Sequence, residues 1–255
     1  MWRSAWCALS LLTLASSASH AETVSVVSPD YWCPYSCKAG SPREGYIVDV
    51  LRQILERHGH VLRYENENYA RALQEARQGR YTLITTVYPE EAPGFSFTHE
   101  PIARASYCFY TRVGNPWRYT GPASLEHVRI GVIKGYSYGP QLNKLIQGKP
   151  DSFDLQTGDA LTSRLAAMVF MSRLDGFIED DNVVRHLLAT QPQIQLKESG
   201  CFAQDFTYVA VSPRFGNSRE LAELIDKELR SLRKSGQLKE ILSRYGLTDW
   251  APPRR

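Results

Sequence analysis

The stretch that decides the fold is EGYIVDVLRQILERHGHVLRY, residues 44–64. Its apolar residues recur at i, i+3, i+4, i+7 and i+8, which places them in one stripe along a helix: Ile47, Val50, Leu51, Ile54 and Leu55. Gly59 can end that helix, and residues 61–64 then read as a strand. The stretch therefore predicts an amphipathic helix followed directly by a strand.

The same alternation extends in both directions from this stretch. Residues 23–28 (TVSVVS) form a β-rich run before it, and residues 69–78 form a second helix after it. Residues 81–87 (YTLITTV) add a third strand. Three strands separated by two helices favour a parallel sheet that is covered by helices.

A second run of strands and helices begins near residue 106 and has about the same size. Its expected strands cover residues 106–112, 128–133, 153–157 and 176–179, and its expected helices cover residues 140–146, 161–174 and 182–189. A strand at 206–212 and helices at 219–234 and 237–245 follow. Two such units predict an α/β protein of two lobes. A cleft between lobes is a common site for small ligands, and it can close by a hinge motion.

The composition excludes several classes of protein. The chain has 255 residues, of which 43% are hydrophobic and 22% charged, so it can bury a core and is not disordered as a whole. Lys and Arg number 30 against 27 Asp and Glu, a net charge of +3. This balance, without basic runs, argues against a nucleic-acid partner.

Residues 1–21 have the features of a cleaved signal peptide. Arg3 supplies the positive start, residues 5–15 are mostly apolar, and Ser19-His20-Ala21 resembles a cleavage site. The apolar run is about half of the roughly 20 residues that span a bilayer. We therefore expect a periplasmic protein that begins near residue 22.

Four cysteines remain after the signal peptide: Cys33, Cys37, Cys108 and Cys201. An even number in an oxidising compartment favours two disulfides, and four cysteines allow three pairings. Of these, we predict Cys33–Cys37 and Cys108–Cys201. The spacing fits a zinc site less well, because Cys108 and Cys201 have no nearby partner in the sequence.

Motifs for enzymes and metals are weak. Residues 135–139 (GYSYG) match the pattern of a nucleophile elbow, but the only later histidine, His186, falls inside an expected helix. The six histidines show no spacing typical of metal ligands. We expect neither a metal nor another cofactor.

Six blocks, in this order, resemble the polar amino-acid type of periplasmic solute-binding proteins, family 3, which have the type II periplasmic binding fold. They are EGYIVDVLRQILER (44–57), YARALQEARQGRYTL (69–83), PEE to FT (89–98), IGVIKGYSY (130–138), LDGFIED (174–180) and SGQLKEILSRYGL (235–247). Each block is weak alone, and the resemblance covers nearly the whole chain after residue 21.

The resemblance implies two discontinuous lobes, each a mostly parallel sheet flanked by helices, joined by two crossing hinge strands. Lobe 1 would comprise residues 22–112 and 203–250, lobe 2 residues 113–202, and residues 251–255 would form a tail. Cys108 and Cys201 then fall on the two crossings, which supports their pairing and implies that the disulfide restricts the hinge.

The resemblance also places the ligand-binding carboxylates. The family's second-lobe carboxylate, which receives the α-amine of the ligand, matches Asp180. The family's arginine, which clamps the α-carboxylate after T-P-E, is replaced by Glu91. The carboxylate of Glu91 would repel the α-carboxylate of a ligand. The substitution therefore favours a cationic or amine-bearing ligand. In the alternative interpretation Glu91 is a solvated loop residue, and Arg104 could supply a relocated cation.

The remaining candidates for ligand contact are aromatic rings and hydroxyl groups, namely Trp32, Tyr35, Tyr69, Thr85, Thr86 and Ser137. Aromatic rings around a cation contribute about 0.5–2 kcal/mol each. Backbone N–H groups near Ser137, at a helix start, could instead hold an anion.

We therefore expect a monomeric binding protein that captures a small polar ligand, amino-acid-like or an amine, for ABC-type uptake through a membrane permease. The alternatives are a periplasmic sensory co-receptor that acts on a membrane receptor and, less favoured, an enzyme of the dehydratase type on the same fold.

Overall fold

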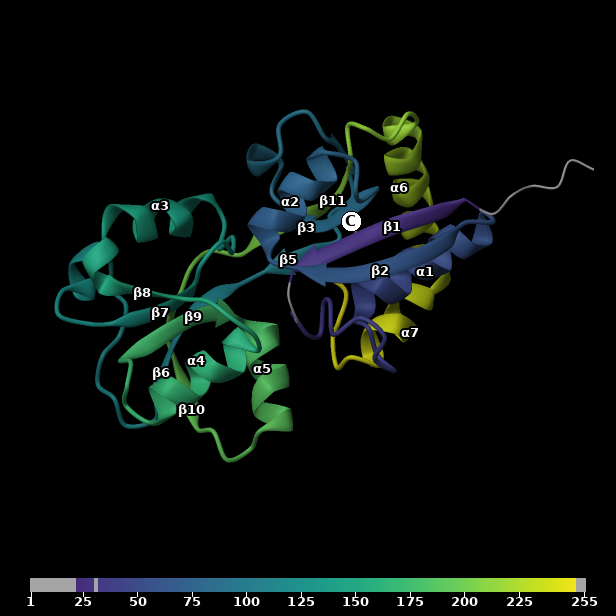
Figure 1. Ribbon diagram of the computed structural model, residues 1–255. Helices are drawn as coiled ribbons and strands as arrows, with labels where there is room; N and C mark the ends of the chain where they lie inside the picture. Colours follow the sequence, from purple (N-terminus) through teal and green to yellow (C-terminus); the bar gives the residue numbers. More distant parts are fainter. Residues whose placement is uncertain (1–21, 30–31, 251–255) are drawn as a thin grey trace, which may run out of the picture.

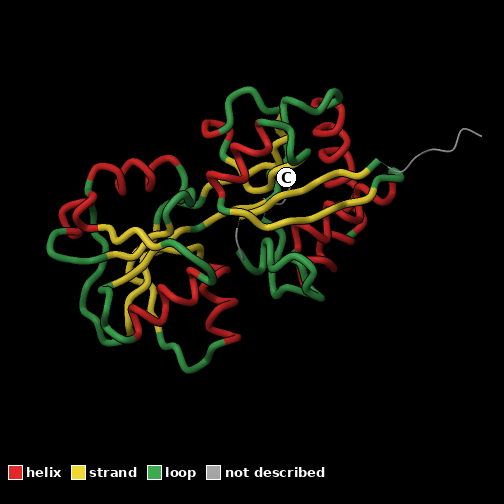
Figure 2. Tube along the Cα trace, viewed as in Figure 1, coloured by secondary structure: helices red, strands yellow, loops and turns green. Residues whose placement is uncertain are grey.

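The chain folds into two lobes, and each lobe contains one β-sheet flanked by helices (Figure 1). The computed structural model describes residues 22–29 and 32–250. The predicted signal peptide, residues 1–21, and the tail, residues 251–255, lie outside the described residues. In Figure 2 the strands of the two sheets form two separate groups, with helices on their outer sides.

The sheet of the first lobe has the order β2-β1-β3-β11-β4, with β5 also paired to β11. Its strands are β1 (Thr23–Pro29), β2 (Val61–Glu67), β3 (Leu83–Val87), β4 (Ser96–Phe97), β5 (Ala103–Ala105) and β11 (Asp205–Val211). β1 is parallel to β2 and β3, as the alternation of elements predicted, and β11 is antiparallel to β3. The helices are α1 (Tyr46–Arg57), α2 (Tyr69–Arg77), α6 (Ser218–Ser235) and α7 (Gln237–Ser243).

The apolar stripe of α1 is buried along its whole length. Its residues, Ile47, Val50, Leu51, Ile54 and Leu55, have no exposed surface. Burial of such side chains contributes about 1.5–3 kcal/mol each, so the helix is held by its packing in the first lobe.

The sheet of the second lobe has the order β10-β6-β9-β7-β8. Its strands are β6 (Tyr107–Arg112), β7 (Ile130–Ile133), β8 (Phe153–Gln156), β9 (Gly176–Asp180) and β10 (Leu196–Cys201). Its helices are α3 (Pro140–Gly148), α4 (Leu161–Phe170) and α5 (Asp181–Thr190). Short 3-10 helices occur at Pro89–Glu91 (η1) in the first lobe and at Pro122–Leu125 (η2) and Pro150–Ser152 (η3) in the second.

The first crossing between the lobes lies at Ser106, earlier than the sequence indicated. The expected lobe 1 includes residues 107–112, and this is wrong, because β6 pairs with β9 and β10 and belongs to the second sheet. The second crossing is the segment 202–204 between β10 and β11. The pairing of β6 with strands distant in the sequence decides this boundary, and the hydropathy of residues 106–112 does not reveal it.

Both predicted disulfides are confirmed. Cys33 is bonded to Cys37 in the loop before α1, and Cys108 is bonded to Cys201. Cys108 and Cys201 are opposite each other on β6 and β10. The second disulfide therefore joins the two crossing strands on the side of the second lobe, and it does not link one lobe to the other.

No helix of residues 22–29 and 32–250 has the length and apolar character needed to cross a membrane.

Candidate functional site

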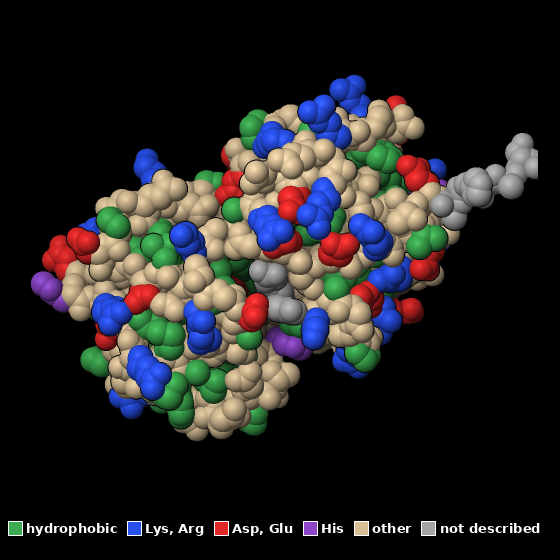
Figure 3. Space-filling model, in the orientation of Figure 1, with side chains coloured by type: hydrophobic (Ala, Val, Ile, Leu, Met, Phe, Trp, Pro, Cys, Tyr) green, Lys and Arg blue, Asp and Glu red, His purple; other side chains and the backbone are tan. Residues whose placement is uncertain are grey.

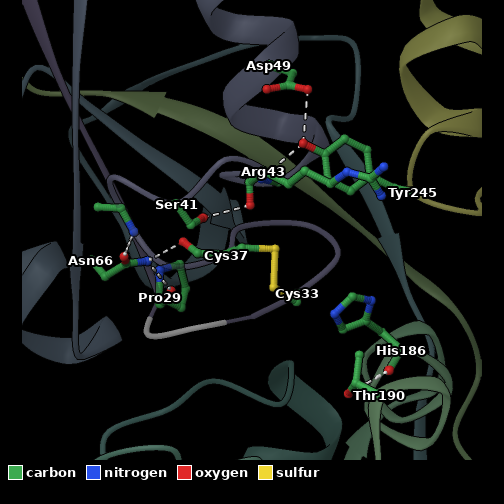
Figure 4. The surroundings of a disulfide bond; sticks show 12 residues. Pro29, Cys33, Cys37, Ser41, Arg43, Asp49, Asn66, His186, Thr190 and Tyr245 are labelled. Atoms are coloured by element: carbon green, nitrogen blue, oxygen red, sulfur yellow. Dashed lines mark hydrogen bonds between the residues drawn. A yellow bond between two sulfur atoms is a disulfide. The ribbon is translucent and has the colours of Figure 1, made fainter.

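A cavity of about 210 Å³, which we call the inter-lobe cavity, is lined by residues of both lobes. The first lobe contributes Cys33, Asn68 and Tyr69. The second lobe contributes Tyr136, the segment 158–163 at the start of α4, and part of α5. Figure 4 shows the Cys33–Cys37 disulfide on one side and His186 and Thr190 of α5 on the other.

Glu91, at the end of η1, connects the two lobes. Its Oε2 accepts a hydrogen bond from Tyr69 Oη of the same lobe at 2.5 Å. Its Oε1 accepts hydrogen bonds from Ser137 Oγ at 2.5 Å and from Asn143 Nδ2 at 3.0 Å, both in the second lobe. Glu91 is therefore directed into the cleft, in contrast to the alternative interpretation of a solvated loop residue.

The start of α3 is arranged around this carboxylate. Ser137 Oγ accepts the backbone N–H of Gly139 at 3.2 Å, and Asn143 Oδ1 accepts that of Tyr138 at 3.0 Å. Both side chains are thereby oriented so that their donors point at Glu91. A helix start favours a negative group, and here the first lobe itself supplies one.

Trp32 and Tyr35 form a stacked pair in the loop before α1, with ring centroids 4.1 Å apart. Trp32 Nε1 donates to Glu179 Oε1 at 3.3 Å. Tyr35 Oη accepts from Asn182 Nδ2 at 2.8 Å and donates to the backbone oxygen of Arg104 at 3.2 Å. Both rings are thus buried against the second lobe.

Glu179 is a fully buried carboxylate on β9. Its Oε2 accepts from Thr162 Oγ1 at 2.7 Å, and its Oε1 accepts from the N–H of Asp180 at 2.9 Å and from Tyr136 Oη at 3.4 Å. Burial raises the pKa of this carboxyl, and these donors offset part of the increase. Sequence reasoning did not single out Glu179.

Asp180 is also fully buried, but its carboxylate is directed at backbone groups. Oδ2 accepts the N–H of Ser106 at 2.8 Å, and Oδ1 accepts those of Asn182 at 2.9 Å and Val183 at 3.3 Å. Asp180 is therefore the N-cap of α5. Burial raises the pKa of Asp180 to about 7, although the hydrogen bond from Ser106 acts in the opposite direction.

The structure gives the two threonines local roles. Thr85 Oγ1 lies 2.5 Å from Ser28 Oγ and joins β3 to β1. Thr86 has a φ of 55°, in the left-handed region, and its hydroxyl donates to the backbone oxygen of Thr85 at 2.8 Å. Their hydroxyl groups are thus occupied within the first lobe.

Arg104 does not reach the inter-lobe cavity. Its side chain is exposed and lines a separate cavity of about 300 Å³ together with Asp181 and Arg185. No Lys or Arg occurs among the described residues that line the inter-lobe cavity. The relocated cation that the sequence left open is therefore absent from this part of the cleft.

Tyrosines complete the wall of the cleft. Tyr107 packs edge-on against Tyr138, with centroids 5.4 Å apart, and donates to the backbone oxygen of Ser137 at 3.1 Å. Burial raises the pKa of Tyr107, Tyr136 and Tyr138 well above the usual value, so they are uncharged at neutral pH. The buried hydroxyl of Tyr88 has no hydrogen-bond partner among the described residues.

Several of these contacts carry only weak sequence signals. Glu179 is adjacent to Asp180 in the LDGFIED block, and alternation along a strand would place one of the two carboxylates on each face. Asn143 and Thr162 occur in unremarkable helical sequence. Asn143 donates to Glu91 and Thr162 donates to Glu179, and the tertiary structure alone brings these partners together.

The surface outside the cleft shows no dominance of one charge. On the face seen in Figure 3, Lys and Arg side chains are interspersed with Asp and Glu over both lobes. This agrees with the small net charge of +3 and does not indicate an extended polyanion-binding face.

Residues 24–248 match the family described as bacterial extracellular solute-binding proteins, family 3. The chain belongs to this family. Its members are typically extracellular or periplasmic and bind small ligands, and the resemblance inferred from the six sequence blocks is thereby confirmed.

Solved structures with 15–20% sequence identity share the fold. An ancestral arginine-binding protein bound to arginine has 20% identity and a TM-score of 0.72, covering 88% of this chain and 97% of its own. A putative L-cystine ABC transporter from Listeria monocytogenes has 15% identity and a TM-score of 0.75, covering 92% and 100%. A histidine kinase sensor domain with similarity to periplasmic binding proteins has 18% identity and a TM-score of 0.73, covering 88% and 96%. No curated protein sequence matches the chain.

Proposed function

We propose that this chain is an exported solute-binding protein that captures a small amine-bearing ligand between its lobes and delivers it to an ABC-type permease. The observation that carries the proposal is the pair of carboxylates in the cleft. Glu91 and Glu179 both accept hydrogen bonds only from neutral groups of the described residues, and no described Lys or Arg lines the adjacent cavity. A ligand cation would supply the missing positive charge.

The position of Glu91 argues against a ligand that must be held by its α-carboxylate. In the family an arginine at this position clamps that group, whereas here Glu91 itself occupies the donors of Ser137 and Asn143. A second carboxylate brought to the same donors would be repelled. The buried tyrosines add ring faces to which a cation is attracted.

Matched ligand pairs test the proposal directly. We would express the full chain with export, purify it, remove bound ligand by unfolding and refolding, and compare L-arginine with agmatine and L-lysine with cadaverine. Each second member lacks only the α-carboxylate. We expect the melting temperature to rise by several degrees with the carboxylate-free amine at about 100 times its Kd. Stronger binding of L-arginine and L-lysine, or of glutamate and succinate, would contradict the proposal.

Two neighbouring glutamates provide a matched control. Glu91→Gln removes one charge from the cleft, and Glu90→Gln removes one from the exposed side of the same 3-10 helix. We expect the first variant to bind agmatine about tenfold or more weakly, because hydrogen bonds to charged groups contribute about 1.5–3 kcal/mol. The second should bind agmatine like the wild type. Equal effects would show that only the overall charge matters.

A sensory role is the second candidate, and the similarity to a histidine kinase sensor domain favours it. Deletion of the gene separates the two roles. Loss of amine uptake supports transport, whereas intact uptake with a lost transcriptional response to the amine supports sensing. Recovery of the bound amine unchanged after incubation would argue against the enzyme alternative.

A further inference from the structure

A second cavity, which we call the hinge cavity, lies beside the crossing 202–204 and has a volume of about 380 Å³. Both lobes and the crossing contribute to its wall, with Tyr88, Ala105 and Asp205 from the first lobe, residues 202–204 from the crossing, and Tyr107, Tyr138 and residues 139–142 from the second lobe. None of these residues lines the inter-lobe cavity. The hinge cavity is therefore a separate space whose shape depends on how the lobes meet.

One buried hydroxyl group at this cavity has no partner. Among the described residues that line it, only Tyr88 has a buried side-chain polar atom without a hydrogen bond, and this residue is 3% exposed. The other tyrosines are paired, because Tyr107 Oη donates to the backbone oxygen of Ser137 at 3.1 Å and Tyr138 Oη accepts the N–H of Ile133 at 2.8 Å. A buried polar group without a partner is unfavourable, so the Tyr88 hydroxyl is available to a group that the chain does not supply.

The end of the Tyr88 ring lies at the wall of the hinge cavity. A Cβ added at Gly139, which lines the cavity, would be 3.3 Å from Tyr88 Oη. Burial raises the pKa of Tyr88, and the nearby carboxylate of Asp205 raises it further, so the phenol is uncharged at neutral pH. An uncharged phenol can accept a hydrogen bond as well as donate one.

The hinge cavity has a negative charge and aromatic walls. Asp205, at the start of β11, is the only charged residue among the described residues that line it. Its Oδ1 accepts the N–H of Phe206 at 2.8 Å, and Asp205 forms no ion pair with another described residue. The rings of Tyr107 and Tyr138 add faces to which a cation is attracted. This combination favours an ammonium group and disfavours an anion, which the carboxylate would repel.

We infer that the hinge cavity is a second binding site, which takes the ammonium group of a small organic amine between Asp205 and Tyr88. The ammonium group donates to the carboxylate of Asp205 and to Tyr88 Oη, next to the tyrosine rings. Because the wall comes from both lobes, an amine at this site stabilises the closed arrangement of the lobes. The site lies outside the inter-lobe cavity, so either site can bind an amine without the other.

Alanine methyl groups can report on the two cavities separately. Ala203 lines the hinge cavity, and Ala160 lines the inter-lobe cavity. We would label the alanine methyl groups of the ligand-free protein with ¹³C, assign the two signals with Ala203→Gly and Ala160→Gly, and titrate with cadaverine. Pentane-1,5-diol, which has the same length and neutral hydroxyl groups, is the control. We expect cadaverine to shift the Ala203 signal and the diol to leave it in place.

The charge of Asp205 is tested by a matched pair of variants. Asp205 is exposed, so Asp205→Asn should leave the fold intact. It should raise the dissociation constant of cadaverine, measured at the Ala203 signal, about tenfold or more. Asp151→Asn removes the same charge from an exposed aspartate of η3 that does not line the cavity, and it should leave this dissociation constant unchanged.

The hydroxyl of Tyr88 is tested by Tyr88→Phe, which removes one oxygen atom and keeps the ring. The melting temperature of the ligand-free variant should rise, because a buried hydroxyl without a partner is removed. Cadaverine should bind more weakly at the Ala203 signal, by about threefold or more. A hydroxyl without a role in binding would give the higher melting temperature and unchanged binding.

The outcomes separate this inference from the proposed function. The inference is overturned if cadaverine does not shift the Ala203 signal, if the diol shifts it equally, or if Asp205→Asn and Tyr88→Phe both bind cadaverine like the wild type. A shift of the Ala160 signal would still support the proposed function in each of these cases. A shift of the Ala203 signal alone would support the inference and contradict capture of the amine in the inter-lobe cavity.

Discussion

At the scale of single residues, adjacent carboxylates on one strand have separate tasks. Asp180 caps α5 with two backbone hydrogen bonds and accepts a third from Ser106 at the crossing, and Glu179 lies among side chains that meet from both lobes. Both are fully buried, and burial raises the pKa of each. The free energy needed to bury these charged carboxylates should therefore make the free energy of unfolding depend on pH.

We expect Asp180→Asn to reduce the pH dependence of stability between about pH 4 and pH 7. The pKa of Asp180 is raised from its ordinary value of 3.8 to about 7 in the folded protein, so the folded state binds the proton more tightly than the unfolded state. Its contribution to stability is complete below about pH 4 and is lost as the pH rises through 7.

Urea unfolding at several pH values measures this effect. Wild-type protein should lose a few kcal/mol through this carboxyl over that range, and Asp180→Asn should lose less. Other titrating groups are common to both proteins, so their effect cancels in the difference. An identical pH profile for the two proteins would contradict the burial of a charged Asp180.

At the scale of elements, the start of α1 depends on a close approach of two backbone segments. Gly45 precedes the helix with a φ of 106°, a conformation that disfavours other residues. A Cβ at this position would lie 2.3 Å from the backbone oxygen of Tyr35 and 2.7 Å from the Cα of Ser36. The same loop carries Trp32 and Tyr35 to the second lobe.

We expect Gly45→Ala to destabilise the first lobe by at least about 2 kcal/mol, because both the φ and the contact are unfavourable. Gly148→Ala is the control, since Gly148 has no heavy atom within 4 Å of the added Cβ. It should change stability by less than about 1 kcal/mol and could stabilise α3. Chemical denaturation followed by circular dichroism compares the two, and equal effects would refute this role of Gly45.

At the scale of the whole molecule, a small set of side chains connects the lobes. Glu91 bonds to Ser137 and Asn143, Trp32 to Glu179, and Tyr35 to Asn182. The closed arrangement of the cleft therefore depends on polar contacts that a hinge motion would break.

We expect Glu91→Ala to open the cleft, because it removes both hydrogen bonds that Glu91 accepts from the second lobe. Small-angle X-ray scattering should show a larger radius of gyration than for wild type. Glu90→Ala, an exposed residue of the same 3-10 helix, should leave it unchanged. A compact Glu91→Ala variant would show that the other inter-lobe contacts are sufficient.

The two disulfides should differ in their effect on overall stability. Cys108 and Cys201 are 93 residues apart in the sequence, and Cys33 and Cys37 only 4. Replacing Cys108 and Cys201 by serine should cost about 2–5 kcal/mol, because a longer loop gains more entropy in the unfolded chain. Replacing Cys33 and Cys37 by serine should lower the free energy of unfolding by less. Urea unfolding of both double variants tests the order, and the reverse order would contradict it.

The α/β architecture of this protein can be predicted from the sequence alone, because it depends on the spacing of apolar residues within short segments. The stripe of α1, the alternation of strands and helices, and the six family blocks depend on residues close to one another in the chain, so they predicted the α/β architecture. They also drew attention to Glu91. Periodicity shows which face of an element is apolar, and this is enough to place helices on a sheet.

The tertiary structure alone decided which side chains meet. Strand β10 (LKESGC) has no regular alternation and is defined by its pairing with β6, which also moves residues 107–112 to the second lobe. Glu91 meets Ser137 across 46 residues, and Trp32 meets Glu179 across 147. The neighbours Glu179 and Asp180 likewise meet different groups, because Asp180 contacts backbone N–H groups at a helix start and a crossing and Glu179 contacts side chains of both lobes. No local pattern encodes such contacts, because the packing of one lobe against the other sets the direction of each buried polar group.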